Sequence, residues 1–141
     1  MHPKSILPGA LLAAFTLPAL ATSGTSLYDR LGGLQQITRI VGNTIDRTSS
    51  DPRARRSFEG IRLAPVKESV AQHLCELAGG PCRYEGASMA DAHKGLAITA
   101  EEFDIMDGYL AEELDAYGVA GTDKAALQKL LGRMKADVTG K

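Results

Sequence analysis

Neither sign of charge dominates this chain of 141 residues, whose formal net charge is −1 at pH 7. Acidic and basic residues are mixed and no basic block occurs, so nucleic acid and anionic membranes are not expected partners. The sequence also lacks the alternation of apolar and polar residues that marks strands, because its apolar residues recur every three or four positions. The missing alternation predicts an all-α protein, and the length suits a single hydrophobic core.

Several motifs that carry chemistry are also missing. The chain has no C-x-x-C or C-x-x-C-H motif, no glycine-rich phosphate loop and no serine elbow. The two cysteines, Cys75 and Cys82, are compatible with one disulfide across a turn or with two free thiols. A zinc site is poorly supported by this spacing. Cysteine–histidine catalysis is no better supported, because Cys75 and His73 point to different sides of one helix.

The N-terminal segment has the layout of a secretory signal. A positive start (Lys4) precedes an apolar run through Leu17, and the small-residue sequence Ala19-Leu20-Ala21 follows. Prolines interrupt this stretch, which is too short for a membrane span. We therefore predict a signal peptide over residues 1–21, a single domain over 22–141 without a membrane span, and export to the periplasm.

Six helices follow from the apolar spacing and from the capping and stop signals. Residues 53–64 are expected to form a loop or short turns. The expected helices run from Ser26 to before Gly32, from Leu34 to before Asp51, from Pro65 to before Gly79, over 88–99, from Thr99 to before Gly118, and from Asp123 to Val138.

Two histidines remain after the signal peptide, and both lie on apolar helix faces. His93 shares a face with Met89 and Leu96, and His73 shares one with Val66 and Val70. A single histidine on such a face is usually satisfied by a backbone carbonyl. Two in so short a chain raise the odds of a shared site. The pattern fits a planar apolar cofactor between two helix faces with one axial imidazole, as in haem sites.

Four segments, in order, resemble those of the group I truncated haemoglobins. They are SLYDRLGG at 26–33, FEG at 58–60, GGPCRYEG at 79–86 and MADAHKGLAIT at 89–99. The resemblance implies a two-over-two helical sandwich around haem b, with His93 as the proximal iron ligand. It further implies that the cofactor is contacted by Phe58, Leu63, Val66, Ser69, Val70, His73, Leu74, Tyr84, Met89, Leu96 and Phe103.

The chain departs from the family on the distal side. Where many members have a tyrosine that hydrogen bonds to oxygen, spacing from Phe58 places Ile45, preceded by Thr44. The other two distal positions are Val66 and Val70. A missing hydrogen bond of roughly 1–3 kcal/mol predicts faster oxygen release, whereas carbon monoxide and nitric oxide should lose less. His73 is expected to pack or to contact a propionate rather than to ligate the iron.

The resemblance thus implies a monomeric haem protein that reversibly binds a diatomic gas: oxygen, nitric oxide or carbon monoxide. Oxygen carriage is the family-level role. One alternative is a haem enzyme, either a nitric oxide dioxygenase or a peroxidase, which would need a reductase as its partner. A second alternative is a helical binding module that has lost its cofactor.

Overall fold

The computed structural model describes residues 25–141, so the predicted signal peptide lies outside the described residues. All regular structure in this part of the chain is helical, which confirms the all-α prediction. The elements are α1 (Leu27–Arg30), α2 (Gly33–Ser50), the 3₁₀ turn η1 (Arg55–Phe58), α3 (Leu63–Leu77), α4 (Met89–Ala92), α5 (Ala100–Ala116), α6 (Gly121–Gly132) and α7 (Lys135–Val138).

The helix starts follow the predicted caps closely. Ser26 and Asp29 form a capping box at α1, and Thr99 and Glu102 form one at α5. Helix α3 begins at Leu63, two residues before Pro65, which was expected to open it. Proline is tolerated there because the amides of the first turn have no partner within the helix.

Two predicted helices are shorter in the structure. Helix α4 makes one turn and ends before His93, because the chain turns at Gly95 (φ +82°) and at Ala97 (φ +47°). The prediction of one continuous helix over Asp123–Val138 is wrong, because the helix breaks between α6 and α7. Gly132 ends α6, and the amide of Met134 bonds the carbonyl of Leu131 (2.9 Å) in a tighter turn.

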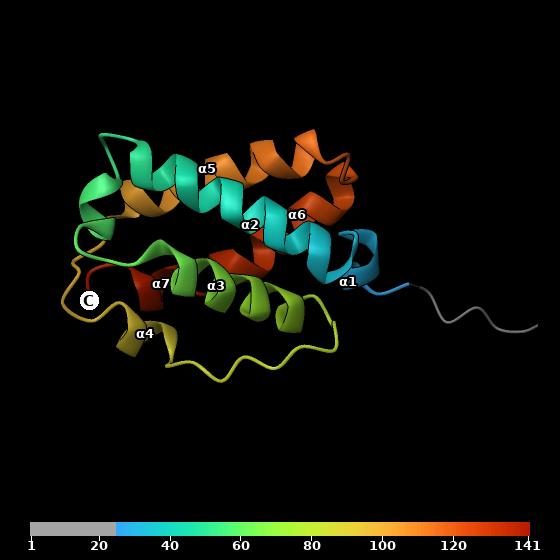
Figure 1. Ribbon diagram of the computed structural model, residues 1–141, viewed down its shortest axis with the longest axis horizontal. Coiled ribbons are helices and arrows are strands. Elements are labelled where there is room, and N and C mark those ends of the chain that lie inside the picture. Colours follow the sequence, from blue (N-terminus) through green and yellow to red (C-terminus); the bar gives the residue numbers. More distant parts are fainter. Residues whose placement is uncertain (1–24) are drawn as a thin grey trace, which may run out of the picture.

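Helix α2 is the centre of the arrangement and packs against both α3 and α5 (Figure 1). Helix α5 in turn packs against α6, so the long helices form two pairs, α2 with α3 and α5 with α6. One face of α2 is fully buried. The core cluster comprises Leu31, Ile37, Ile40, Val41, Ile45, Ala71, Leu74, Cys75, Ala78, Leu110, Leu114, Val119 and Leu127.

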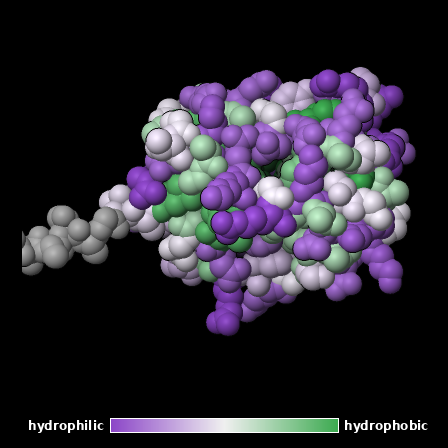
Figure 2. Space-filling model, turned by 180° about the vertical axis from the view of Figure 1, so that it is seen from behind, coloured by the Kyte–Doolittle hydropathy of each residue, from purple (hydrophilic) through white to green (hydrophobic). Residues whose placement is uncertain are grey.

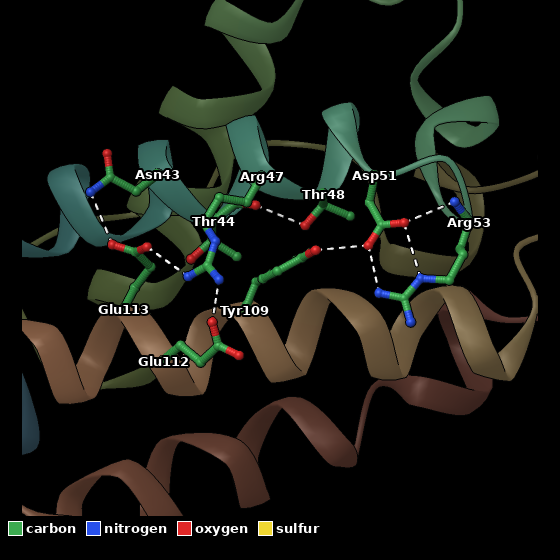
Figure 3. Close-up of polar contacts among 9 residues, drawn as sticks. All are labelled: Asn43, Thr44, Arg47, Thr48, Asp51, Arg53, Tyr109, Glu112 and Glu113. Carbon is green, nitrogen blue, oxygen red and sulfur yellow. Dashed lines mark hydrogen bonds and ion pairs between the residues drawn. The ribbon is translucent and has the colours of Figure 1, made fainter.

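Polar contacts connect α2 with α5 (Figure 3). Arg47 pairs with buried Glu113 at 2.9 Å, and its guanidinium lies 4.2 Å from the centre of the Tyr109 ring. The Tyr109 hydroxyl donates to Asp51 at the end of α2 (2.7 Å). Hydrogen bonds from Arg53 and Tyr109 hold the pKa of the Asp51 carboxyl well below its ordinary value. These contacts fix the position of α2 along α5.

Hydrophilic side chains cover much of the surface seen in Figure 2, with apolar groups scattered among them. Among residues 25–141, Ile61 is the one large apolar residue classed as exposed, at 37%. Within the same range, no helix combines the length and hydropathy that a membrane crossing requires.

Cys75 and Cys82 form a disulfide, which settles the alternatives that the sequence left open. Their Cα atoms lie 5.7 Å apart, within the range for such a bond. Cys75 is fully buried near the end of α3, and Cys82 lies in the loop that follows. The disulfide therefore ties this loop to α3.

We predict that the double variant Cys75→Ser/Cys82→Ser unfolds with a free energy about 2 kcal/mol lower than that of the wild type, since the disulfide closes a short loop in the unfolded chain. Urea unfolding measures the difference. A dithiol should lower the wild-type midpoint and leave the double variant unchanged. Equal midpoints for the double variant and for the wild type without dithiol would contradict the prediction.

Candidate functional site

A cavity of about 340 Å³ lies among α2, α3, α4, α5 and the turn between α6 and α7. Its wall is largely apolar, and its volume falls within the roughly 300–1,000 Å³ that is common for cofactor sites. Twelve residues predicted from the sequence line it: Thr44, Phe58, Val66, Ser69, Val70, His73, Leu74, Tyr84, Met89, His93, Leu96 and Phe103.

Two predicted site residues do not line the cavity. Ile45 is fully buried in the core cluster, and its neighbour Thr44 faces the cavity instead. Leu63, the first residue of α3, packs against the core cluster. The cavity wall contributed by α2 therefore consists of Val41, Thr44 and Thr48, which recur at helical spacing.

The sequence analysis missed several lining residues. Met106, Leu110, Leu131, Met134 and Val138 all lie on the apolar faces used to predict helices, but the sequence offered no sign that those faces meet a cavity. Asp107 also lines it and had no such signal. The complete set of missed residues is Val41, Thr48, Ala54, Ser57, Ile61, Ala92, Ile98, Glu102, Met106, Asp107, Leu110, Leu131, Met134 and Val138.

His93 follows directly after α4 and is half-buried in the cavity wall. Its Nδ1 lies 2.7 Å from the carbonyl oxygen of Met89. Because a carbonyl can only accept, Nδ1 carries a proton, and Nε2 is the ring nitrogen left to bind a ligand. Among the described residues, Nε2 has no recorded hydrogen-bond partner, so it is available to a ligand in the cavity.

The two threonine hydroxyls of the α2 wall are both engaged, and Figure 3 shows the bond from Thr48 to Thr44. Thr44 donates to the carbonyl of Ile40 at 2.8 Å, and Thr48 donates to that of Thr44 at 2.7 Å. Each proton therefore points back along α2. The α2 wall consequently offers the cavity no free hydroxyl donor in this arrangement.

His73 stacks on Tyr84 at the edge of the cavity. The ring centroids are 4.3 Å apart and the rings are 14° from parallel. Burial lowers the pKa of His73 below its ordinary value of 6.5, with nearby Glu76 opposing the effect. The imidazole is therefore neutral at neutral pH.

Two carboxylates line the cavity, and their pKa values are shifted in opposite directions. Burial opposes the ionisation of Glu102, but the amide of Thr99 and the side chain of Arg56 outweigh it and lower its pKa. Asp107 accepts a hydrogen bond from Gln128 at 3.0 Å, whereas its buried Oδ1 has no partner within residues 25–141. Burial accordingly raises the pKa of Asp107 above 3.8.

The donor set fits a haem rather than a bare metal ion. Residues 25–141 hold no cluster of three histidine, cysteine, aspartate or glutamate side chains that could bind an ion. The cavity instead offers the His93 imidazole, whose Nε2 is free, and walls that bury a flat apolar molecule. A porphyrin supplies the other four iron ligands itself, so one protein ligand is enough.

The sequence profile of the bacterial-like globin family matches residues 26–140. A group 1 truncated hemoglobin, GlbN, from Mycolicibacterium paratuberculosis is 34% identical over 94 residues, covering 67% of this chain and 69% of that protein. Another GlbN, from Nostoc sp., is 30% identical over 75% of this chain and 91% of its own length.

Solved structures show the same likeness. The truncated hemoglobin of Tetrahymena pyriformis in its Fe(III) form superposes with a TM-score of 0.79 at 26% identity, covering 83% of this chain and all of that chain. The 2/2 hemoglobin of a Synechococcus species, crystallised with covalently attached heme, gives a TM-score of 0.75 at 26% identity over 81% of this chain and 98% of that chain.

We predict that Asp107→Asn stabilises the ligand-free chain at neutral pH. A carboxyl whose pKa is higher in the folded than in the unfolded chain stabilises the fold at pH values below the unfolded pKa of about 3.8. This stabilisation is lost as the pH rises through the pKa of the folded state. The neutral amide avoids the loss and keeps an acceptor for Gln128. Urea unfolding at pH 7, 5 and 4 should show a gain that shrinks toward pH 4. A gain that is constant with pH would exclude this cause.

Proposed function

Because this chain belongs to the bacterial-like globin family, we propose that its cavity binds haem b and that the haem reversibly binds a diatomic gas. One observation carries the proposal: the imidazole of His93 presents a free Nε2 in an apolar cavity while Nδ1 is held by the carbonyl of Met89. The oriented ring is what an axial ligand to haem iron requires.

The residues that would hold the haem come from both sides of the cavity. Phe58 and Phe103 offer ring faces for the porphyrin, and Val66, Val70 and Leu74 offer an aliphatic wall on α3. Haem supplies an iron with one open position for a gas. The role of the apolar walls is to exclude water, and the role of the Met89 carbonyl is to keep the His93 proton on Nδ1.

The α2 wall favours gases that need little hydrogen bonding. Its two hydroxyls donate to backbone carbonyls, and the opposing positions on α3 are Val66 and Val70. A wall without a free hydroxyl donor stabilises polarised oxygen poorly, whereas nitric oxide and carbon monoxide depend less on a donor. Ser69 lines the cavity but is exposed. We propose fast oxygen release as the consequence.

Export and the monomeric state are further parts of the proposal. A disulfide forms most readily in an oxidising compartment, which supports a periplasmic location after cleavage following Ala21. Ile61 is the one exposed large apolar residue among those described, and this supports a monomer. Mass spectrometry of the exported protein, together with its sedimentation behaviour, tests both parts.

We predict that the wild-type chain binds one equivalent of haem and that His93→Ala loses the axial ligand. Optical titration should give a stoichiometric wild-type complex with a broad, high-spin reduced spectrum. His93→Ala should bind more weakly, with an altered spectrum that added imidazole restores. His73→Ala is the matched control and should keep the wild-type high-spin spectrum. No binding to the wild type, or an unchanged spectrum in His93→Ala, would refute the proposal.

We predict that Val66→Gln slows oxygen dissociation by about tenfold, because one added hydrogen bond to a polarised ligand contributes about 1.5 kcal/mol or more. Stopped-flow exchange against carbon monoxide measures the rate. Val66→Leu adds bulk without a donor and should change it little, and carbon monoxide dissociation should respond less than oxygen in both variants. Equal slowing by leucine and glutamine would show that bulk alone controls release.

A further inference from the structure

Two neighbouring interactions, one covalent and one non-covalent, join the end of α3 to the loop after it. One is the disulfide Cys75–Cys82, and the other is the ring stack of His73 on Tyr84. The stacked residues lie two positions before Cys75 and two positions after Cys82. The disulfide therefore brings back to α3 the segment of chain that carries Tyr84.

The loop fits closely around the Tyr84 ring. The hydroxyl of Tyr84 donates to the carbonyl of Ala87 (2.8 Å), and its amide donates to Glu76 of α3 (3.3 Å). A Cβ atom at Gly86 would overlap the hydroxyl end of the ring, so the backbone passes directly against it. A Cβ atom at Gly80 would likewise overlap the Tyr28 ring and the sulfur of Cys75. The loop thus holds Tyr84 in contact with both Gly86 and His73.

His73 is the second imidazole in the wall of the cavity. Its pKa is lowered by burial, so the ring is neutral and carries a lone pair at neutral pH. The stack with Tyr84 is the one ring contact recorded for it among the described residues. A neutral imidazole is a ligand for haem iron, so a His73 ring that swings to the open iron position competes there with a gas.

We propose that Tyr84 is a positioning residue that holds the His73 imidazole in the cavity wall and off the haem iron, and that the Cys75–Cys82 disulfide holds Tyr84 in place. This inference rests on the proposed haem function. A dithiol removes the restraint: it passes two electrons and two protons to the protein sulfurs, which become two thiols, and is itself oxidised to a disulfide. Reduction then favours a six-coordinate iron and slower gas binding.

The test compares haem-loaded wild type, Tyr84→Ala and Cys75→Ser/Cys82→Ser by optical spectroscopy. An aromatic stack stabilises its geometry enough to bias a two-state equilibrium by about two- to tenfold. The ratio of low-spin to high-spin iron should therefore rise by that factor in both variants, and carbon monoxide association should slow by up to the same factor. Tyr84→Phe is the matched control: it keeps the ring and should keep the wild-type spectrum.

Adding His73→Ala to each variant identifies the ligand, because the low-spin bands should then disappear. Bands that persist without His73, or a low-spin ratio that Tyr84→Ala leaves unchanged, would overturn the inference. Failure of the wild type to bind haem would instead overturn the proposed function on which it rests. Circular dichroism establishes that each variant is folded.

A second readout needs no haem. Because the His73 ring stacks on the Tyr84 ring, the carbon-bound protons of the imidazole should show a ring-current shift in the NMR spectrum of the haem-free chain. This shift should be lost in Tyr84→Ala, kept in Tyr84→Phe, and reduced in Cys75→Ser/Cys82→Ser. A shift that is unchanged without the disulfide would show that the loop positions Tyr84 without it, and would remove the redox step from the inference.

Discussion

The structure depends on the burial of α2 against two partners at once. Its apolar face packs on α3 and α5 together, and the cavity is lined by these same three helices. Apolar packing alone would let helices slide, since it has little directional preference. The pairing of Arg47 with Glu113 and of Tyr109 with Asp51 sets the position of α2 along α5. The wall that α2 contributes to the cavity is therefore fixed by contacts on the α5 side of α2.

The two threonines on the α2 wall of the cavity limit the hydrogen bonds that this wall can donate to a ligand. A hydroxyl in an apolar cavity needs a hydrogen bond, and both Thr44 and Thr48 find it in a carbonyl one turn earlier in their own helix. The hydroxyl protons are thus directed along the helix. The wall contains polar residues and yet presents few free donors, so its ligand preference depends on where each proton points rather than on composition.

Local patterns predicted the helix starts well, because caps depend on residues three apart. The motif resemblance likewise placed His93, Phe58 and Phe103 around one site, and all three line the cavity. Spacing failed between Thr44 and Ile45, since neighbours on a helix differ by about 100° and the roll of α2 decides which one faces inward. The disulfide could not be predicted from the sequence either, because it depends on the loop returning to α3 so that the Cα atoms of Cys75 and Cys82 lie 5.7 Å apart.

The segment that carries His93 is held in place by more than the short helix α4. A single turn such as α4 has little stability of its own. The support comes from distant parts of the chain. Arg56 of η1 donates to the carbonyls of Leu96 and Ala97, and the backbone of Ala97 and Ile98 pairs with that of Gly140 and Lys141. Ala97 holds an unusual left-handed φ of +47°, which a free turn would relax. The position of the imidazole is therefore set by the tertiary fold around α4, and changes in η1 or in the residues after α7 reach the cavity through this segment.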